Sequence, residues 1–493
     1  MEFQPTPTDG VETETSEMQF DTEQLISRLF EKSSFDLNSY KLNRTLHLNW
    51  LVRLCFQGFP SRYVSQDASQ PWLLFWILQS FQTLGVAVDP TTKQRAIDTI
   101  LANQHPSGGF GGGPGQLPHL LPTYAAVCSL AIVGRPGEGG GWDQIDRQKM
   151  YQWFLSLKQP DGSFIVCHDA EVDMRGCYCL LTVATLLDML TPELVRGTRA
   201  FVSSCQTYEG GFSASSYPYF TSDAPNHLSS LLRSPRPSLG EAHGGYTFCA
   251  VASLLLLRAQ KDEGKDVLDT KKLLRWAVGM QGQEIEGGGF RGRTNKLVDG
   301  CYSWWVGGLF ALIDDLLGAG GAPLERLDHD SHSDGKEGDD SHEWQDFEDG
   351  LFNKQALQKF VLVSSQSTTG GLRDKPGKPA DAYHTLYNLS GLSSAQHHVY
   401  RSAEQAAKLE SQWVRSAPFI PTGKEATESD EGRNERRKRI WVDANSWTED
   451  EVASRYVGGK ENRVNATHPV FDLTMTTSRA ITNYFYGQNV PIA

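Results

Sequence analysis

The chain has 493 residues, enough for two or three average domains or for one large core, and a formal net charge of −13 at pH 7. That charge argues against a general nucleic-acid-binding protein, and no apolar run approaches the roughly 20 residues that cross a bilayer. The acidic first residues lack the pattern of a signal peptide or presequence and the eight cysteines are dispersed, so we expect a cytoplasmic protein with reduced thiols.

A repeated glycine motif organises most of the chain. Residues 1–40 are acidic, and we expect them to be flexible; the apolar run PWLLFWILQSF from Pro71 then predicts the first buried helix. After it, a glutamine, a few polar residues, one or more glycines and a large apolar residue recur. The copies begin at Gln104, Gln159, Gln206, Gln283 and Gln366 and end at Phe110, Phe164, Phe212, Phe290 and Leu372. Five copies indicate an internal structural repeat.

Each copy separates two kinds of predicted helix. Amphipathic stretches such as DQIDRQKMYQWFLSLK precede the motifs and predict outer helices, whereas almost wholly apolar stretches such as YTFCAVASLLLLRA follow them and predict buried inner helices. Alternating outer and inner helices form either an open solenoid or a closed ring. We favour a closed all-α ring, because its bulky inner side chains would line a central cavity with Trp, Tyr and Phe, suited to an apolar ligand.

The predicted ring spans residues 41–413 and carries two surface insertions, from about 213 to 240 and from about 318 to 345. These are the places where the spacing between motif copies stretches. The polar segment 414–463 follows, and we expect it to be flexible. Residues 464–493 are expected to pack back on the ring.

Two clusters of charged side chains fall in these irregular segments. The second insertion contains His329, His332 and His342 among acids, where a solvated loop is favoured over a metal-binding tract. The polar segment carries a basic cluster from Arg436 to Arg439. We interpret it as part of a solvated excursion rather than as a nuclear signal or a contact with an acidic partner.

A count along the repeats brings reactive residues to one level. The eleventh residue after the large residue of a motif is Arg175, Cys301 or Tyr383, so all three are expected at the same end of the ring. Asp299 lies two residues before Cys301, and His384 follows Tyr383. An Asp, a Cys and a His make a three-ligand set that leaves Zn²⁺ the open fourth position of a catalytic site. Without this register, Cys301 would be interpreted as an inert core residue.

Cationic and phenolic side chains surround this trio in the sequence: His243, Arg293, Lys296 and Tyr302, with Arg175 at the equivalent level of another repeat. Any one of them alone is ordinarily a solvated surface residue. Together they predict a site for a phosphate or diphosphate, bound by charge-assisted hydrogen bonds within an acidic protein. An anion site above an aromatic cavity suits a ligand with an apolar tail and a phosphorylated head.

Four stretches carry a family resemblance: DASQPWLLFWIL from Asp67, EAHGGYTFCA from Glu241, GGFRGRTNKLVDGCYSWW from Gly288 and GGLRDKPGKPADAYHTLYNLSGLS from Gly370. They closely resemble the β subunits of protein farnesyltransferases, over about residues 40 to 400 and again at THPVFDLT near the C-terminus. The resemblance implies an α-α barrel, in agreement with the closed ring. It also implies a zinc enzyme that transfers farnesyl from farnesyl diphosphate to C-terminal CaaX cysteines of proteins such as small GTPases, as a heterodimer with a helical-repeat α subunit.

The resemblance implies roles residue by residue. Asp299, Cys301 and His384 match the zinc ligands, whose open position takes the substrate thiolate, and Asp374 matches the carboxylate that engages Mg²⁺ on the diphosphate. The diphosphate-binding positions are matched by His243, Arg293, Lys296 and Tyr302. The isoprenoid channel is matched by Arg175, Tyr178, Gly245, Tyr246, Cys249 and Trp305. The pocket for the aliphatic CaaX residue is matched by Trp72, Trp76 and Tyr383.

The resemblance also implies which lipid is used. Trp72 and Tyr387 occupy the positions of the bulky aromatics that end the channel after three isoprene units, so a C15 lipid is expected rather than a C20 lipid. The β subunit of a geranylgeranyltransferase, either CaaX-directed or Rab-directed, is the main alternative. The two insertions and the polar segment depart from the family pattern.

Other helical rings fit less well. A triterpene cyclase would need an acidic proton donor of the Asp-x-Asp-Asp kind, and the nearest sequence, at 337–340, lies in the second predicted insertion. A noncatalytic interaction ring of the complement thioester type would need a Gly-Cys-Gly-Glu-Gln segment, which the sequence lacks.

Overall fold

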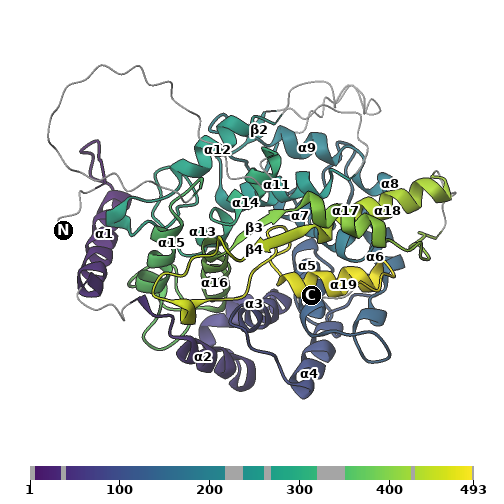
Figure 1. Cartoon of the computed structure of the whole chain (residues 1–493), viewed down its shortest axis with the longest axis horizontal. Helices are drawn as coiled ribbons and strands as arrows, with labels where there is room; N and C mark the ends of the chain where they lie inside the picture. Colours follow the sequence, from purple (N-terminus) through teal and green to yellow (C-terminus); the bar gives the residue numbers. More distant parts are fainter. Residues whose placement is uncertain are drawn as a thin grey trace.

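A ring of inner helices forms the centre of the computed structural model, which describes residues 6–34, 40–216, 237–259, 268–318, 350–422 and 428–490. The inner helices are α3 (Gln70–Thr83), α5 (Leu120–Val133), α7 (Met174–Leu186), α11 (Gly244–Leu256), α13 (Tyr302–Trp305) and α16 (Ala382–Gln396). Each contacts the next in this order, and α16 contacts α3 (Figure 1). The ring is therefore closed, and the prediction of a closed ring rather than an open solenoid is confirmed.

Outer helices surround this ring. They are α2 (Arg44–Gln57), α4 (Pro90–Leu101), α6 (Arg147–Leu157), α8 (Pro192–Val195), α9 (Thr198–Ser204), α12 (Thr270–Gly279) and α15 (Lys354–Phe360), which continues as a π-helical turn, Val361–Ser365. In α12, Leu273 and Trp276 are buried while Lys271 and Arg275 are exposed, as expected of an amphipathic helix. None of the helices that the structure describes is both long enough and apolar enough to span a bilayer.

A β-bridge joins the large apolar residue of each glycine motif to the residue that begins the motif or lies just before it. The bridges join Gln104 to Phe110, Lys158 to Phe164, Gln206 to Phe212, Gln281 to Phe290 and Gln366 to Leu372. In two copies the paired residue is not the glutamine that begins the motif, because Lys158 pairs in place of Gln159 and Gln281 in place of Gln283. In the fourth copy an additional 3₁₀ turn, Glu284–Glu286, lengthens the loop, so the more distant glutamine is the one that pairs.

The motif glutamines join each repeat to the next. The Gln206 amide donates to the Asp269 carbonyl at 3.0 Å and accepts from the Asp269 N–H at 3.0 Å, and Asp269 caps α12. In the last copy, the Gln366 amide donates to the Lys41 carbonyl at 2.9 Å and accepts from the N–H of Asn43 at 2.8 Å, at the start of α2. Because α2 belongs to the first repeat, this contact closes the outer layer as well.

Glycine is required where each loop touches that next outer helix. At Gly210, φ is +112° and a Cβ atom would lie 2.2 Å from the Lys272 carbonyl oxygen in α12. At Gly370, φ is +93° and a Cβ atom would lie 2.6 Å from the Leu46 carbonyl oxygen in α2. Any larger residue would push neighbouring repeats apart and strain the backbone, which explains why glycines recur in the motif.

The acidic N-terminal segment was predicted to be flexible, but Glu14–Ser34 form helix α1, which contacts the 3₁₀ turn of the fourth motif. Thr22 and Ile26 are buried and Phe30 is half-buried, a spacing of four residues that places them on one face of the helix. Phe30 and Ile26 cover Gly287. The prediction was wrong because the surrounding charged residues obscured this narrow apolar face.

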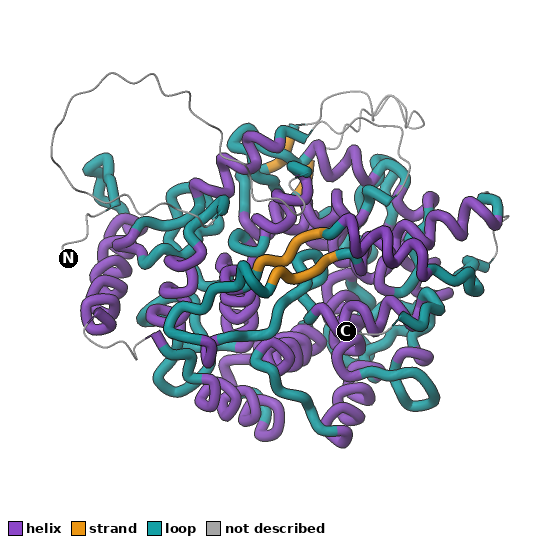
Figure 2. Tube along the Cα trace, in the orientation of Figure 1, coloured by secondary structure: helices purple, strands orange, loops and turns teal. Residues whose placement is uncertain are grey.

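The polar segment that follows residue 413 was also predicted to be flexible, yet it contributes α18 (Asp430–Asn445) and strand β4 (Trp447–Asp450). Strand β4 pairs antiparallel with β3 (His398–Arg401), the longer of the two strand pairs drawn in Figure 2. Helices α17 (Ala403–Gln412) and α19 (Met475–Phe485) pack against α18. These elements cover one side of the ring.

The predicted insertions are only partly described. The described ends of the first insertion form two strands, β1 (Ser215–Ser216) and β2 (Ser238–Leu239), which pair with each other. The second follows α14 (Leu309–Leu316), and its histidines and the acidic stretch at 337–340 lie outside the described residues. Short 3₁₀ helices occur at Ser61–Gln66, Trp142–Gln144 and Lys460–Asn462.

Two residues of the basic cluster of α18, Arg436 and Arg437, are buried rather than solvated. Arg437 and Asp188 form an ion pair with an Nη2–Oδ2 distance of 2.9 Å, and their side chains are only 2% and 4% exposed. Arg436 is paired with Glu428 at 3.0 Å. The prediction of a solvated excursion was wrong because Asp188 lies 249 residues earlier in the chain, beyond the reach of local sequence patterns.

We expect Arg437→Met to lower the free energy of unfolding by about 3–5 kcal/mol, because it leaves the Asp188 carboxylate buried without its partner. The change is measured by denaturant unfolding. Arg415→Met is the matched control, since Arg415 pairs with Glu431 on the surface, where both side chains are more than half exposed. That variant should lose less than about 1 kcal/mol; equal losses would show that the buried pair has no special role.

Candidate active site

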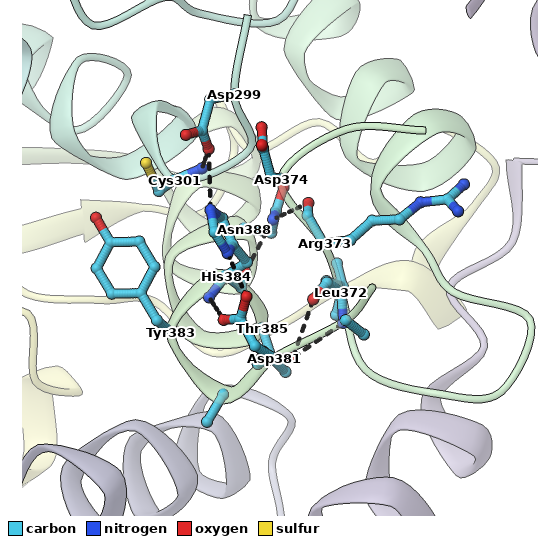
Figure 3. A network of polar contacts seen from close by, with 12 residues as sticks. Asp299, Cys301, Leu372, Arg373, Asp374, Asp381, Tyr383, His384, Thr385 and Asn388 are labelled. Atoms are coloured by element: carbon cyan, nitrogen blue, oxygen red, sulfur yellow. Dashed lines mark hydrogen bonds and ion pairs between the residues drawn. The ribbon is translucent and has the colours of Figure 1, made fainter. Parts of the chain in front are cut away.

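The three predicted metal ligands meet where α13 and α16 begin. Asp299 and Cys301 precede α13, His384 lies in the first turn of α16, and the possible ligand atoms of all three lie within 4.8 Å of one another (Figure 3). Cys301 is buried, and the other two are partly exposed. Within the described ranges of the chain, this is the one group of His, Cys, Asp and Glu side chains that could hold a metal ion.

Carboxylate hydrogen bonds to backbone N–H groups hold the trio in place. The Asp299 carboxylate accepts the N–H of Cys301 at 2.8 Å, and the Asp381 carboxylate accepts the N–H of His384 at 2.8 Å. The second Asp381 oxygen lies 2.7 Å from Nδ1 of His384, which leaves Nε2 facing Asp299 at 3.2 Å (Figure 3). A carboxylate that fixes one imidazole nitrogen while the other faces the ligand set is the usual arrangement at metal-bound histidines.

The charges of the trio are strongly coupled. Burial alone would lower the pKa of His384, but its contacts with Asp299 and Asp381 raise it to about 10. Burial alone would raise the pKa of Asp299, but the hydrogen bond with His384 lowers it. Burial and then the Asp299 charge raise the pKa of the Cys301 thiol. One sulfur, one nitrogen and one oxygen donor this close together fit Zn²⁺, whose binding would release protons from Cys301 and His384.

Hydrogen-bond donors flank the trio on α11 and α13. The His243 Nε2 atom lies 3.1 Å from the Tyr302 hydroxyl, and Nδ1 accepts the N–H of Gly245 at 3.0 Å, which places the ring proton on Nε2. Burial, followed by the charges of Arg293 and Arg175, lowers the pKa of His243 to about 4. The ring is therefore a neutral donor near neutral pH.

The remaining predicted anion-binding residues lie at the edge of this cluster. Arg293 forms an ion pair with Glu241, and both side chains are accessible to solvent. Lys296 is exposed on the same loop. The Arg175 guanidinium lies over the Tyr246 ring, 5.5 Å from its centroid, and Tyr246 packs against the imidazole of His243. The structure thus brings Tyr302, His243 and Arg293 together and places Arg175 beside them, with Lys296 at the periphery.

An unbroken circle of aromatic contacts passes through every inner helix of the ring. Neighbouring ring centroids lie between 4.6 and 5.8 Å apart. In order, the members are Trp72, Tyr124, Tyr178, Phe248, Trp305, Tyr387, Tyr383 and Trp76, which returns to Trp72. Cys249 is buried next to Phe248, and Gly245 lies in the first turn of the same helix. These side chains give the centre of the ring an apolar wall.

The aromatic circle contains a residue that the sequence analysis missed. Tyr124 contacts both Trp72 and Tyr178 at 5.5 Å. It lies fourteen residues after Phe110, as Tyr178 lies fourteen residues after Phe164, so the same count along the repeats would have found it.

A second missed residue lies beside the metal-ligand trio. The Lys375 ammonium contacts the Asp374 carboxylate, and its side chain is only 11% exposed. The Asp374 carbonyl accepts the N–H of Gly300 at 2.7 Å, which joins this pair to the loop that carries Asp299. Burial and then the charge of Asp299 raise the pKa of Asp374. Lys375 stands next to Asp374 within the quoted family stretch, and a search for paired charges there would have found it.

Comparisons with known proteins agree with this architecture. Residues 42–473 match the family model of the prenyltransferase alpha-alpha toroid domain. The chain is 37% identical over 367 residues to protein farnesyltransferase subunit beta of Pisum sativum. This alignment covers 68% of this chain and 80% of the relative. It is 28% identical over 386 residues to geranylgeranyl transferase type-1 subunit beta of Arabidopsis thaliana, covering 72% of this chain and 85% of the relative.

A solved structure shows the same fold. It is the Candida albicans protein geranylgeranyltransferase-I complexed with GGPP, which aligns with a TM-score of 0.58 and 17% identity over 90% of this chain and 99% of that chain. At this identity the likeness concerns the fold alone.

Proposed function

Because this chain belongs to the protein farnesyltransferase β-subunit family, with its prenyltransferase α-α toroid, we propose that it transfers farnesyl from farnesyl diphosphate to the cysteine of a C-terminal CaaX motif. One observation supports this chemistry most directly. Asp299, Cys301 and His384 converge next to the donors His243 and Tyr302, and Tyr383 of the aromatic circle packs against His384. That combination suits a thiol acceptor, a diphosphate leaving group and an isoprenoid tail.

In the proposed enzyme, Asp299, Cys301 and His384 would hold Zn²⁺, and Asp374 would engage Mg²⁺ on the diphosphate. When bound, zinc lowers the pKa of the substrate thiol, so that the nucleophilic thiolate forms near neutral pH. Asp381 orients His384 through its Nδ1 contact. Lys375 compensates part of the negative charge of Asp374 while the site is free of ligand.

The anion-binding cluster acts on the leaving group. As the bond between the isoprenoid C1 and the diphosphate oxygen breaks, negative charge grows on the diphosphate, and preorganised donors stabilise it. His243 and Tyr302 donate from fixed positions, and Arg293 and Lys296 contribute full positive charges. The isoprenoid lies against the wall formed by Arg175, Tyr178, Gly245, Tyr246, Cys249 and Trp305.

The aromatic circle also serves the peptide and sets the lipid length. Trp72, Trp76 and Tyr383 form the pocket for the aliphatic CaaX residue, and the Trp305 indole donates to the Tyr383 hydroxyl at 3.1 Å. Trp72 and Tyr387 end the channel, which selects a C15 lipid. The chain works as a heterodimer with a helical-repeat α subunit in the cytoplasm, on substrates such as small GTPases.

Co-expression with candidate α subunits tests the proposal. The purified heterodimer is assayed with a CaaX peptide and with farnesyl and geranylgeranyl diphosphates side by side. We expect transfer to the cysteine, with the higher kcat/KM for the C15 lipid and no product from a peptide whose cysteine is replaced by serine. Preference for the C20 lipid would favour the geranylgeranyl alternative, and failure to modify the peptide with either lipid would reject the proposal.

A further inference from the structure

Asp472 is a buried carboxylic acid to which the proposed mechanism gives no role. The backbone φ of Asp472 is +53°, and the residue is 2% exposed. Its Oδ1 atom accepts the Ser390 hydroxyl at 2.8 Å, whereas Oδ2 has no hydrogen-bond partner among the residues that the structure describes. Burial raises the pKa of Asp472 well above its usual range and favours the neutral acid. Such an unmet polar group costs folding free energy, so packing alone does not explain it.

Asp472 is the last residue of a run of three consecutive residues, Val470 to Asp472, that accept hydrogen bonds from inner helices of the ring. The Tyr178 hydroxyl donates to the Val470 carbonyl at 2.8 Å, and the Tyr124 hydroxyl donates to the Phe471 carbonyl at 3.0 Å. Both tyrosines belong to the aromatic circle. The run therefore fixes their rings through two consecutive carbonyl groups.

Asp472 extends this attachment to α16. Its partner Ser390 lies three residues after Tyr387, so the two side chains share one face of that helix, with Ser390 one turn deeper. An ionised Asp472 would raise the pKa of Tyr124, Tyr178 and Tyr387 alike, which places the carboxyl near all three rings. Three consecutive residues thus tie down the three helices that carry these tyrosines.

Two polar side chains lie one helical turn beyond the aromatic circle. Gln79 on α3 lies three residues after Trp76, and Thr182 on α7 lies four residues after Tyr178. Both are buried, and the Gln79 amide and the Thr182 hydroxyl have no hydrogen-bond partner in the described part of the chain. The packing beside the aromatic circle is therefore not wholly apolar.

We propose that Asp472, acting through Ser390, is a positioning residue that sets the depth of the isoprenoid channel and so contributes to the selection of a C15 over a C20 lipid. The inference rests on the proposed farnesyl transfer. Loss of the Ser390 bond frees the run from α16, and Tyr124 and Tyr178 lose the fixed carbonyls that orient them. The channel then accepts a longer lipid, while the metal ligands at the start of the helices stay in place.

Two alanine variants test this inference in the heterodimer with its α subunit. In Asp472→Ala and in Ser390→Ala, the ratio of kcat/KM for farnesyl over geranylgeranyl diphosphate should fall about fivefold, the effect of one net hydrogen bond. The double variant should show no further fall, because both changes remove the same bond. Asp472→Asn should retain the ratio, since Asn tolerates the left-handed backbone and offers an oxygen to Ser390.

Ser393→Ala is the matched control, the same change one turn further along α16. The Ser393 hydroxyl donates to the Asn465 carbonyl at 2.9 Å and accepts the N–H of Thr467 at 3.0 Å, outside the run. In Ser393→Ala, the ratio of kcat/KM for farnesyl over geranylgeranyl diphosphate should not change. An unchanged ratio in an active Ser390→Ala enzyme would overturn the inference, as would an equal fall in Ser393→Ala. If Asp472→Ala does not fold, Ser390→Ala decides alone. If the wild-type heterodimer transferred no farnesyl, that result would instead reject the proposed function, and the inference with it.

Discussion

Cys301→Ala is expected to abolish zinc retention and farnesyl transfer while leaving the helical ring intact. The substitution removes the one sulfur donor of the trio and leaves only the Asp299 oxygen and the His384 nitrogen. Substitutions outside the immediate ligands already cost roughly 10- to 100-fold in metal affinity at many sites, so loss of a ligand should cost more. Cys301 is buried, but alanine fills most of its volume, and we expect the protein to fold.

The measurement is zinc content per heterodimer after purification without chelator, together with the rate of CaaX peptide modification. Cys55→Ala is the matched control, because Cys55 is a free, half-buried thiol in outer helix α2, away from the trio. It should keep its zinc and its activity. Full zinc occupancy in Cys301→Ala would remove Cys301 from the ligand set.

Trp72→Thr is expected to shift lipid preference strongly toward geranylgeranyl diphosphate. Trp72 lies between Trp76 and Tyr124 in the aromatic circle, so its loss opens the wall where the channel should end. Burying the five extra carbons of a C20 lipid is worth up to about 4 kcal/mol at roughly 0.8 kcal/mol per methylene. The ratio of kcat/KM for the two lipids should therefore change by up to about a thousandfold.

The ratio is measured with both diphosphates in the same heterodimer preparation. Trp413→Thr makes the same substitution at a residue of similar partial exposure, where the indole donates to Asn434 far along the chain from the aromatic circle. That variant should keep the wild-type ratio even if its stability falls. An unchanged ratio in Trp72→Thr would refute the assignment of Trp72 to the channel end.

Local patterns were sufficient to predict the ring and the position of the trio. The 3.6-residue period separates inner from outer helices, and the glycine motifs mark the loops between them. Since each motif feeds an inner helix in the same way, counting eleven residues placed Arg175, Cys301 and Tyr383 at the starts of α7, α13 and α16. A repeat relates residues that are distant in sequence by a fixed count from each motif. The three ligands could therefore be predicted to lie together from the sequence alone.

Features that depend on distant partners could not be predicted in the same way. Arg437 looks like a solvated cation until Asp188 is brought beside it by the fold. Helix α1 gains its apolar partner only when the fourth glycine loop covers Ile26. Asp472 likewise appears in the sequence as an ordinary polar turn residue. Its burial depends on three helices that converge around it from separate repeats.

Diffraction data from crystals of the heterodimer, collected on both sides of the zinc absorption edge, test the metal assignment most directly. We expect one anomalous peak at the rim of the aromatic wall, bonded to the Asp299 carboxylate, the Cys301 sulfur and Nε2 of His384. A zinc-dependent enzyme whose peak lay elsewhere, with these three side chains apart from it, would contradict the proposed catalytic centre.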